Sequence, residues 1–133
     1  MFLLVFSLLS GVPASQGDLM GNFQESRISE ISNQFRKGNT KELSKHLSSS
    51  VNLSLMNSEN VYSKAQSEII LDRFFKEYPP QSLKIIHRLD NNSNFQHAVF
   101  LLNTAKGDFR VAVSLRGAEA NLQLIEIRIE KPN

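Results

Sequence analysis

Three side chains in this sequence carry functional groups suited to binding or converting a small molecule: Tyr62, His87 and Arg110. An imidazole titrates near neutral pH and can act as a general base or acid. A phenol hydroxyl can orient a bound ligand, and a guanidinium group can hold an anionic one. These roles need neither a cofactor nor a metal ion, and we expect neither.

His87 lies in a segment in which apolar and polar residues alternate, as they do in a half-buried strand. It shares one face of that segment with Leu83, Ile85 and Leu89, so the alternation predicts an imidazole that points toward the apolar interior. No carboxylate on the same face is evident as a partner for a general base. We therefore favour a structural histidine bonded to a backbone carbonyl over a catalytic one.

Tyr62 and Arg110 each have a structural interpretation that competes with ligand binding. Tyr62 precedes a long predicted helix, where aromatic side chains usually anchor the packing and keep the hydroxyl in solvent. Arg110 follows a hairpin turn and lies on the polar face of its strand, where it can form a cross-strand pair with Glu126 or Glu130. We favour the structural roles and keep ligand binding by Tyr62, His87 and Arg110 as a hypothesis.

Most other kinds of active site find no support in the sequence. His46 and His97 share no metal-binding spacing with His87, and the absence of Cys excludes disulfides, zinc–thiolate centres and thiol catalysis. No serine occupies a nucleophile elbow, and no glycine-rich phosphate loop occurs. Lys and Arg number 15 against 13 Asp and Glu, and this net charge of +2 is too small a bias to predict nucleic-acid binding.

Residues 1–17 have the pattern of a secretory signal peptide. They contain no charged side chain, and their short apolar run ends at Gly11 and Pro13. Small residues follow, which indicates cleavage after Ala14 or Gly17 rather than a buried strand or helix. No Lys or Arg precedes the run, and the run is too short to span a membrane. We expect a soluble exported protein, periplasmic or extracellular, with a single domain over residues 18–133.

Hydrophobic periodicity predicts the elements that position these residues. Helical spacing predicts helices over residues 22–37, 40–47 and 63–78, the second of them short. Alternation predicts strands over residues 51–55, 83–89, 109–116 and 122–130. Residues 61–62 form a brief return strand after a turn, and residues 95–102 are apolar on both faces, as in a central strand. The third helix has apolar residues around more than half of its circumference, so we expect other elements to cover it on two sides.

Helices followed by a run of strands with short turns indicate an α+β fold with a curved, mainly antiparallel sheet. The long helix lies between an early hairpin and a later meander, so the sheet can curl around it as a cone with one open end. Helices cover the inner face, and the small residues Ala112 and Ser114 lie on the outer face. We expect Leu122 and Leu124 there too, which would suit the outer face to an isologous homodimer.

The order of elements resembles the nuclear transport factor two-like, or cystatin-like, superfamily. Several blocks resemble a family of small exported Bacteroidetes proteins known only as a domain of unknown function. The blocks are RKGNTKEL at residues 36–43, ENVYSKAQ at 59–66, Phe74-Phe75, GDFRV at 107–111 and IEIRIE at 125–130. The similarity covers about residues 24–130 and implies a cone-like fold and export, but no activity. The wider superfamily includes ketosteroid isomerase-like and scytalone dehydratase-like enzymes, whose catalytic residues do not align with this chain.

Two functions remain open. The first is a non-catalytic exported binding module, which holds a small apolar ligand in the cone or binds a protein partner, such as a second copy, on the outer sheet face. The second is an isomerase or dehydratase that uses His87 and Tyr62 as acid and base. This enzyme would need both side chains to converge in one pocket, and we favour the binding module.

Overall fold

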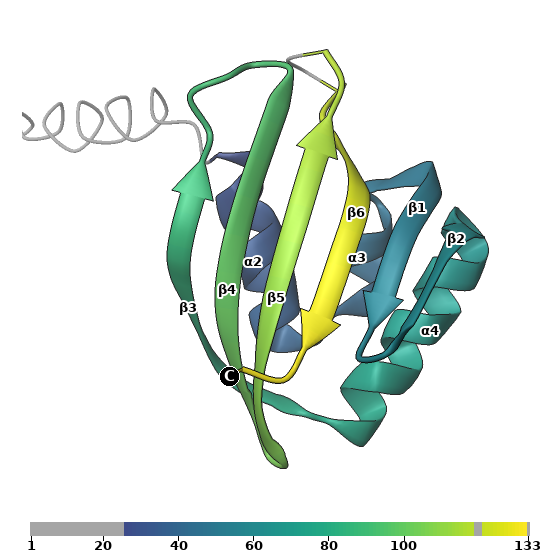
Figure 1. The fold of residues 1–133 in the computed structure, drawn as a ribbon, viewed down its shortest axis with the longest axis vertical. Helices are drawn as coiled ribbons and strands as arrows, with labels where there is room; N and C mark the ends of the chain where they lie inside the picture. Colours follow the sequence, from purple (N-terminus) through teal and green to yellow (C-terminus); the bar gives the residue numbers. More distant parts are fainter. Residues whose placement is uncertain (1–25, 119–120, 133) are drawn as a thin grey trace, which may run out of the picture.

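A curved six-stranded sheet carries helices on one of its faces (Figure 1). The computed structural model describes residues 26–118 and 121–132, so the predicted signal peptide at residues 1–17 lies outside the described residues. No helix in the described part of the chain is long and apolar enough to cross a membrane. The predicted α+β architecture, with helices packed on a mainly antiparallel sheet, is confirmed.

The strands lie in the order β2-β1-β6-β5-β4-β3. Their bounds are β1 (Leu47–Leu55), β2 (Ser58–Ser63), β3 (Pro80–Leu89), β4 (Phe95–Thr104), β5 (Gly107–Arg116) and β6 (Gln123–Glu130). Neighbouring strands are antiparallel except for β1 and β6, which run parallel. The edge strands are therefore β2 and β3, and β3 begins at Pro80, a position where a residue without an N–H group is tolerated.

Capping residues set the ends of the helices, which are α2 (Arg27–Lys37), α3 (Thr40–Ser44) and α4 (Lys64–Glu77). The Ser26 side chain accepts a hydrogen bond from the Ser29 N–H at the start of α2. Gly38 ends α2 at a φ of 66°, a left-handed conformation that costs glycine little. Ser63 begins α4 in a capping box with Gln66.

Apolar side chains fill the space between the helices and the inner face of the sheet. Phe35 of α2 is fully buried, and its ring centroid lies 5.8 Å from those of Phe75 in α4 and Phe100 in β4. Ring pairs at this spacing add to the free energy gained from burial alone. The two helices and the central part of the sheet are therefore packed into one core.

One extra residue in β3 turns His87 away from the interior, contrary to the prediction. Ile85 pairs with Phe100 of β4, but the next pair is His87 with Val99, so Ile86 is the additional residue. A bulge of one residue exchanges the two faces of a strand for the side chains beyond it. His87 is consequently exposed on the outer face, and its predicted contact with the apolar interior is wrong.

The residues after the bulge show the same exchange of faces. Leu89 was predicted to lie inside with His87, yet it is 48% exposed. Arg88, between them, lies on the inner face, where its Nη2 donates a hydrogen bond of 2.7 Å to Ser26 Oγ at the start of α2. The bulge thus links the end of β3 to the first turn of α2.

A second irregularity changes the predicted composition of the outer face. The register between β5 and β6 shifts after Ser114, and Ile125 is the extra residue of β6. Leu124 then faces the core, and Leu122 is buried there as well. The prediction that these two leucines lie on the outer face is therefore wrong, whereas Ala112 and Ser114 alternate with core residues and do lie there.

Helix α4 is covered on one side rather than on the two sides predicted. Its buried residues are Ser67, Leu71, Phe74 and Phe75. Ile69 is 55% exposed, so the broad apolar distribution did not indicate a helix enclosed by other elements. Strand β1 also begins earlier than predicted, at Leu47, because α3 ends at Ser44.

Candidate functional site

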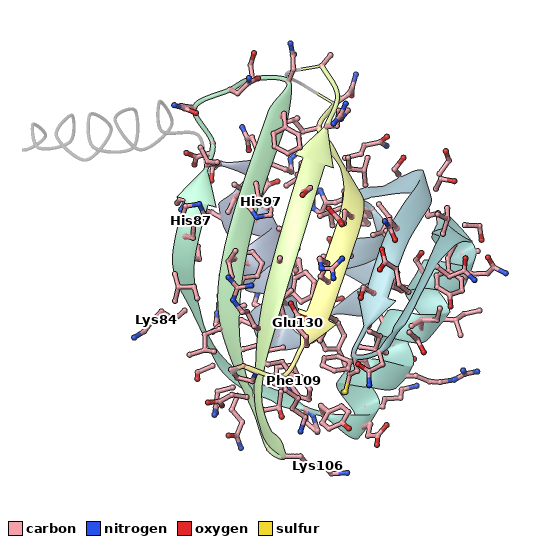
Figure 2. The ribbon with its side chains drawn as sticks, viewed as in Figure 1. Lys84, His87, His97, Lys106, Phe109 and Glu130 are labelled. Carbon is pink, nitrogen blue, oxygen red and sulfur yellow. The ribbon has the colours of Figure 1, made fainter. Side chains whose placement is uncertain are left out.

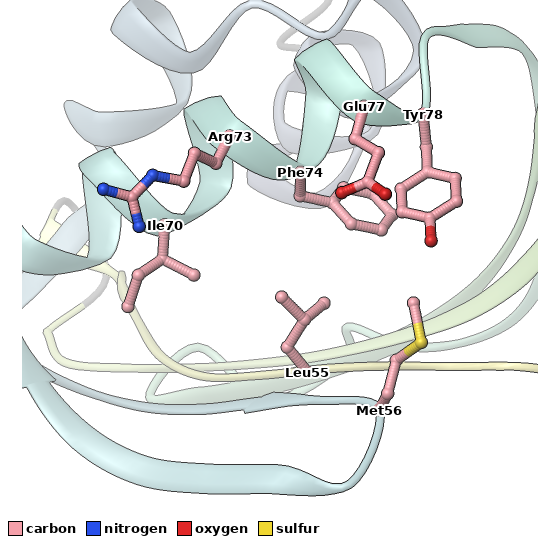
Figure 3. A pocket seen from close by; sticks show the side chains of 7 residues that line it. All are labelled: Leu55, Met56, Ile70, Arg73, Phe74, Glu77 and Tyr78. Atoms are coloured by element: carbon pink, nitrogen blue, oxygen red, sulfur yellow. The ribbon is translucent and has the colours of Figure 1, made fainter.

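A pocket of about 340 Å³ opens between the second half of α4 and the turn that joins β1 to β2 (Figure 3). Two stretches of chain line it: Leu55 and Met56 from the first, and Ile70, Arg73, Phe74, Glu77 and Tyr78 from the second. Four of these residues are partly buried and pack against the core, so the pocket lies where the core reaches solvent. Its volume is at the small end of the range found for ligand sites.

Aromatic rings form the wall of the pocket on the α4 side. Phe74 and Tyr78 lie one helical turn apart, and their ring centroids are separated by 5.1 Å. Behind them, the buried ring of Phe109 from β5 lies 5.1 Å from Phe74 and 4.8 Å from Tyr78. Lys106 Nζ lies 5.9 Å from the centroid of the Tyr78 ring, at a distance suited to a cation–π contact. The wall is therefore fixed in place by neighbours on both sides.

Met56 forms the opposite side of the pocket from a strained backbone position. Its φ is 56°, and it is the only residue other than glycine with a positive φ in the described part of the chain. This left-handed conformation costs an L-residue with a side chain roughly 1–2 kcal/mol. The Met56 N–H donates a hydrogen bond of 2.7 Å to the Ile129 carbonyl of β6, which holds the turn in place. The flexible thioether side chain extends from the turn toward Tyr78 (Figure 3).

Two exposed charges stand at the rim of the pocket. Arg73 and Glu77 are one turn apart on α4, and Figure 3 shows both on the α4 side of the opening, with Glu77 nearer Tyr78. The other lining residues are apolar apart from the Tyr78 hydroxyl group. The arrangement suits a small ligand with an apolar body, because it offers few polar groups inside and a charge of each sign outside.

The structure does not bring Tyr62, His87 and Arg110 together. Tyr62 lies on β2, partly buried against the core, whereas His87 lies on the outer face of β3 at the opposite edge of the sheet (Figure 2). Arg110 lies on the outer face of β5, where the register places it opposite Glu130 of β6. Glu126, the other predicted partner, pairs with Arg128 at 3.8 Å instead. None of the three predicted ligand residues lines the pocket.

The outer face of the sheet has a basic half and an acidic half. On strands β3, β4 and β5, the register places three basic residues and one acidic residue there: Lys84, Arg110, Arg116 and Asp108. On strands β6, β1 and β2, it places three acidic residues and one basic residue there: Glu126, Glu130, Glu59 and Arg128. The formal charges of the described side chains are thus +3 − 1 = +2 on one half and +1 − 3 = −2 on the other.

The pocket is not evident in the sequence because the residues of its walls resemble ordinary core residues. Ile70 and Phe74 fit the buried side of a helix, and Leu55 fits the alternation of a strand. Met56 gives the one available signal, since it interrupts the alternation immediately before a polar turn. That signal does not show that the turn lies across from α4, because the position of the turn relative to α4 depends on how the two elements pack in the folded protein.

A family model described as a domain of unknown function, DUF4783, matches residues 28–130. A comparison with curated proteins finds no match. A crystal structure of a DUF4783 family protein from Bacteroides uniformis is 26% identical, with a TM-score of 0.76, and the match covers 81% of this chain and 99% of that one. Crystal structures of family members from Bacteroides ovatus and Bacteroides fragilis also match.

Two more distant structures support the predicted fold type. A domain of unknown function with a cystatin-like fold from Nostoc punctiforme is 7% identical, with a TM-score of 0.61, over 79% of this chain and 72% of that one. A protein named Rd1NTF2_04, with a long sheet, is 12% identical, with a TM-score of 0.62, over 77% of this chain and 94% of that one. The predicted similarity to nuclear transport factor two-like and cystatin-like folds is confirmed, and so is the similarity to a Bacteroidetes family of unknown function.

Proposed function

This chain belongs to the DUF4783 family, a domain family of unknown function, and we propose that it is a non-catalytic module that binds a small apolar ligand. The pocket between α4 and the β1–β2 turn carries the proposal. Its walls are apolar and partly buried, and an aromatic cluster supports them from behind. Such walls bind ligands mainly by burying apolar surface, and the flexible Met56 side chain can adjust to different shapes.

The alternative enzyme function has less support. An isomerase or dehydratase would need His87 and Tyr62 within hydrogen-bond reach of one substrate. His87 lies on edge strand β3 and Tyr62 on edge strand β2, on opposite faces of the sheet. The pocket between α4 and the β1–β2 turn has one hydroxyl group, from Tyr78, and no imidazole among its lining residues.

The binding proposal is tested by substituting two adjacent isoleucines of α4. Ile70 lines the pocket, whereas Ile69 is exposed and lines a separate hollow on α4, so Ile70→Ser and Ile69→Ser are a matched pair. The probe is N-phenyl-1-naphthylamine, an uncharged apolar dye that fluoresces more strongly when it leaves water. We expect the untagged protein to bind the dye, Ile70→Ser to weaken binding by about tenfold, and Ile69→Ser to leave it unchanged.

Circular dichroism of each variant confirms that it is folded before the titration. Equal weakening by both substitutions would place the dye elsewhere and contradict the proposal. A folded protein that does not bind the dye at all would also contradict it.

We also propose that the outer face of the sheet forms an isologous homodimer. A two-fold axis that runs parallel to the strands, between two sheets stacked on their outer faces, would place the basic half of one copy against the acidic half of the other. The small residues Ala112 and Ser114 near the middle of the sheet would allow two sheets to approach closely. Electrostatic complementarity of this kind aligns partners and disfavours other orientations.

Export and domain organisation also stay predictions. A signal peptide over residues 1–17, followed by a single domain over residues 18–133, is our proposal for the chain. The intact mass of the protein isolated from the cell envelope shows whether residues 1–17 have been removed. Cleavage after Ala14 or Gly17 supports export, and an uncleaved chain contradicts it.

A further inference from the structure

The bulge in β3 brings two histidines together on the outer face of the sheet (Figure 2). His87 lies opposite Val99, and His97 lies two residues before Val99 on β4, so the two histidines are diagonal neighbours. Their ring centroids are 6.4 Å apart, and their ring planes are inclined by 63°. Diagonal neighbours on adjacent strands lie within reach of each other when their side chains are long or aromatic.

Hydrogen bonds on the outer face orient the His97 ring. His97 Nδ1 lies 3.0 Å from Ser114 Oγ, and this hydroxyl donates a longer bond of 3.4 Å to Glu126 Oε1. A serine hydroxyl has a single proton, so a serine that donates to Glu126 must accept from His97. This arrangement places the proton of a neutral His97 on Nδ1 and leaves the lone pair on Nε2.

We propose that His87 and His97 form a surface site for a divalent transition-metal ion such as Zn²⁺. The two imidazoles supply two nitrogen ligands, and water fills the remaining positions. No group of three or more metal-ligating side chains occurs among the described residues, so the two imidazoles are the protein's contribution to the coordination. The site shares no residue with the apolar pocket and does not depend on the proposed ligand. It lies on the same outer sheet face as the proposed dimer and uses Ser114 of that face.

The chemistry of the ligands selects the class of metal. Imidazole nitrogen suits Zn²⁺, Ni²⁺ and Cu²⁺, whereas Mg²⁺ and Ca²⁺ prefer oxygen ligands. Histidines that bind metals commonly donate their other ring N–H to a carboxylate, a carbonyl or a water molecule, which fixes the ring and raises its basicity. Here His97 Nδ1–H donates to the Ser114 hydroxyl, and this hydroxyl donates in turn to the Glu126 carboxylate. Ser114 and Glu126 are therefore positioning residues for His97.

The three histidines of the chain provide a matched test. ZnCl₂ is titrated into the untagged protein by isothermal calorimetry, and MgCl₂ serves as the control ion. We expect heat from Zn²⁺ and none from Mg²⁺. His87→Gln and His97→Gln should each abolish Zn²⁺ binding, whereas His46→Gln, on the helical side of the molecule, should retain it.

A fourth variant distinguishes an oriented site from two independent surface histidines. Ser114→Ala keeps both ligands and removes the bond to Nδ1, so we expect Zn²⁺ affinity to fall by about tenfold. His87 is exposed, so His87→Gln should fold normally and keeps the test valid if His97→Gln proves unstable. The absence of Zn²⁺ binding by the unaltered protein would overturn the proposal. Binding that survives His87→Gln, or that is lost in His46→Gln, would overturn it as well.

Discussion

Met56 combines a strained backbone conformation with a place in the wall of the pocket. The β1–β2 turn requires a positive φ at this position, and glycine would meet that requirement without the steric cost of a side chain. The methionine side chain instead forms one side of the pocket. A strained residue next to a pocket is a common feature of functional sites.

Met56→Gly should therefore separate stability from binding. Relief of the left-handed strain, worth roughly 1–2 kcal/mol, offsets the loss of a half-buried side chain. We expect the free energy of unfolding in urea to change by less than about 1 kcal/mol. Binding of N-phenyl-1-naphthylamine should weaken clearly, because the dye loses one wall. Unchanged dye binding in this variant would show that Met56 is not part of the ligand site.

At the scale of elements, the junction between α3 and β1 contains a histidine with a shifted titration. Burial lowers the pKa of His46 below its ordinary value of 6.5, and the nearby Arg27 guanidinium lowers it further. The carboxylates of Glu30 and Glu42 act in the opposite direction. The backbone carbonyl of His46 accepts a hydrogen bond of 2.7 Å from Leu124 N–H, so this junction ties the helices to β6.

The lowered pKa of His46 predicts a loss of stability in weak acid. The unfolded chain binds the proton at a higher pH than the folded one, so the free energy of unfolding falls as the pH drops below about 6.5. Urea denaturation at about pH 8 and about pH 5.5 measures this change. We expect His46→Gln to reduce the loss between the two pH values. The matched control, His87→Gln, lies on the exposed outer face and should keep it. An identical loss in both variants would exclude His46 as its source.

The helices and strands were largely predictable from the sequence. Which residues of β3 and β6 point to each face of the sheet was not. Alternation identified β5, in which every second residue from Phe109 is apolar and buried, and a run that is apolar on both faces identified β4. In β3, Ile85 and Ile86 are both apolar, so nothing in the sequence distinguishes the bulged residue from a regular one. The orientation of His87 depends on its register with β4, which is a property of the packed sheet.

The candidate sites could not be predicted for a related reason. The pocket combines Leu55 and Met56 with residues of α4, and their apolar side chains resemble those of any core. The histidine pair requires the hairpin of β3 and β4 together with the bulge. In both sites the chemistry arises from elements brought together by the fold, and neither has a local sequence motif.

At the scale of the whole molecule, the divided charge of the outer sheet face predicts self-association. Ala112 lies near the middle of that face, so Ala112→Glu would place a charge where two sheets must meet. We expect this variant to be monomeric by sedimentation velocity under conditions in which the unaltered protein is a dimer. Ala65→Glu makes the same substitution on the exposed side of α4 and should leave the dimer intact.

Salt gives an independent measure of the same interface. Because the proposed contact joins opposite charges, salt should screen the attraction and weaken the dimer. We expect the dissociation constant of the dimer, measured by sedimentation velocity, to rise as the salt concentration rises. A protein that is monomeric at every concentration and salt level tested would contradict the proposal.

The place of β6 in the sheet has a consequence for how the chain is made. This strand is the last of the six in the sequence, yet it lies between β1 and β5 and joins the first hairpin to the later meander. A ribosome synthesises residues 123–130 after all of the other strands, so the two parts of the sheet remain separate until that segment emerges. Closure of the sheet is therefore a late event of biosynthesis, and the growing polypeptide stays incompletely folded until then.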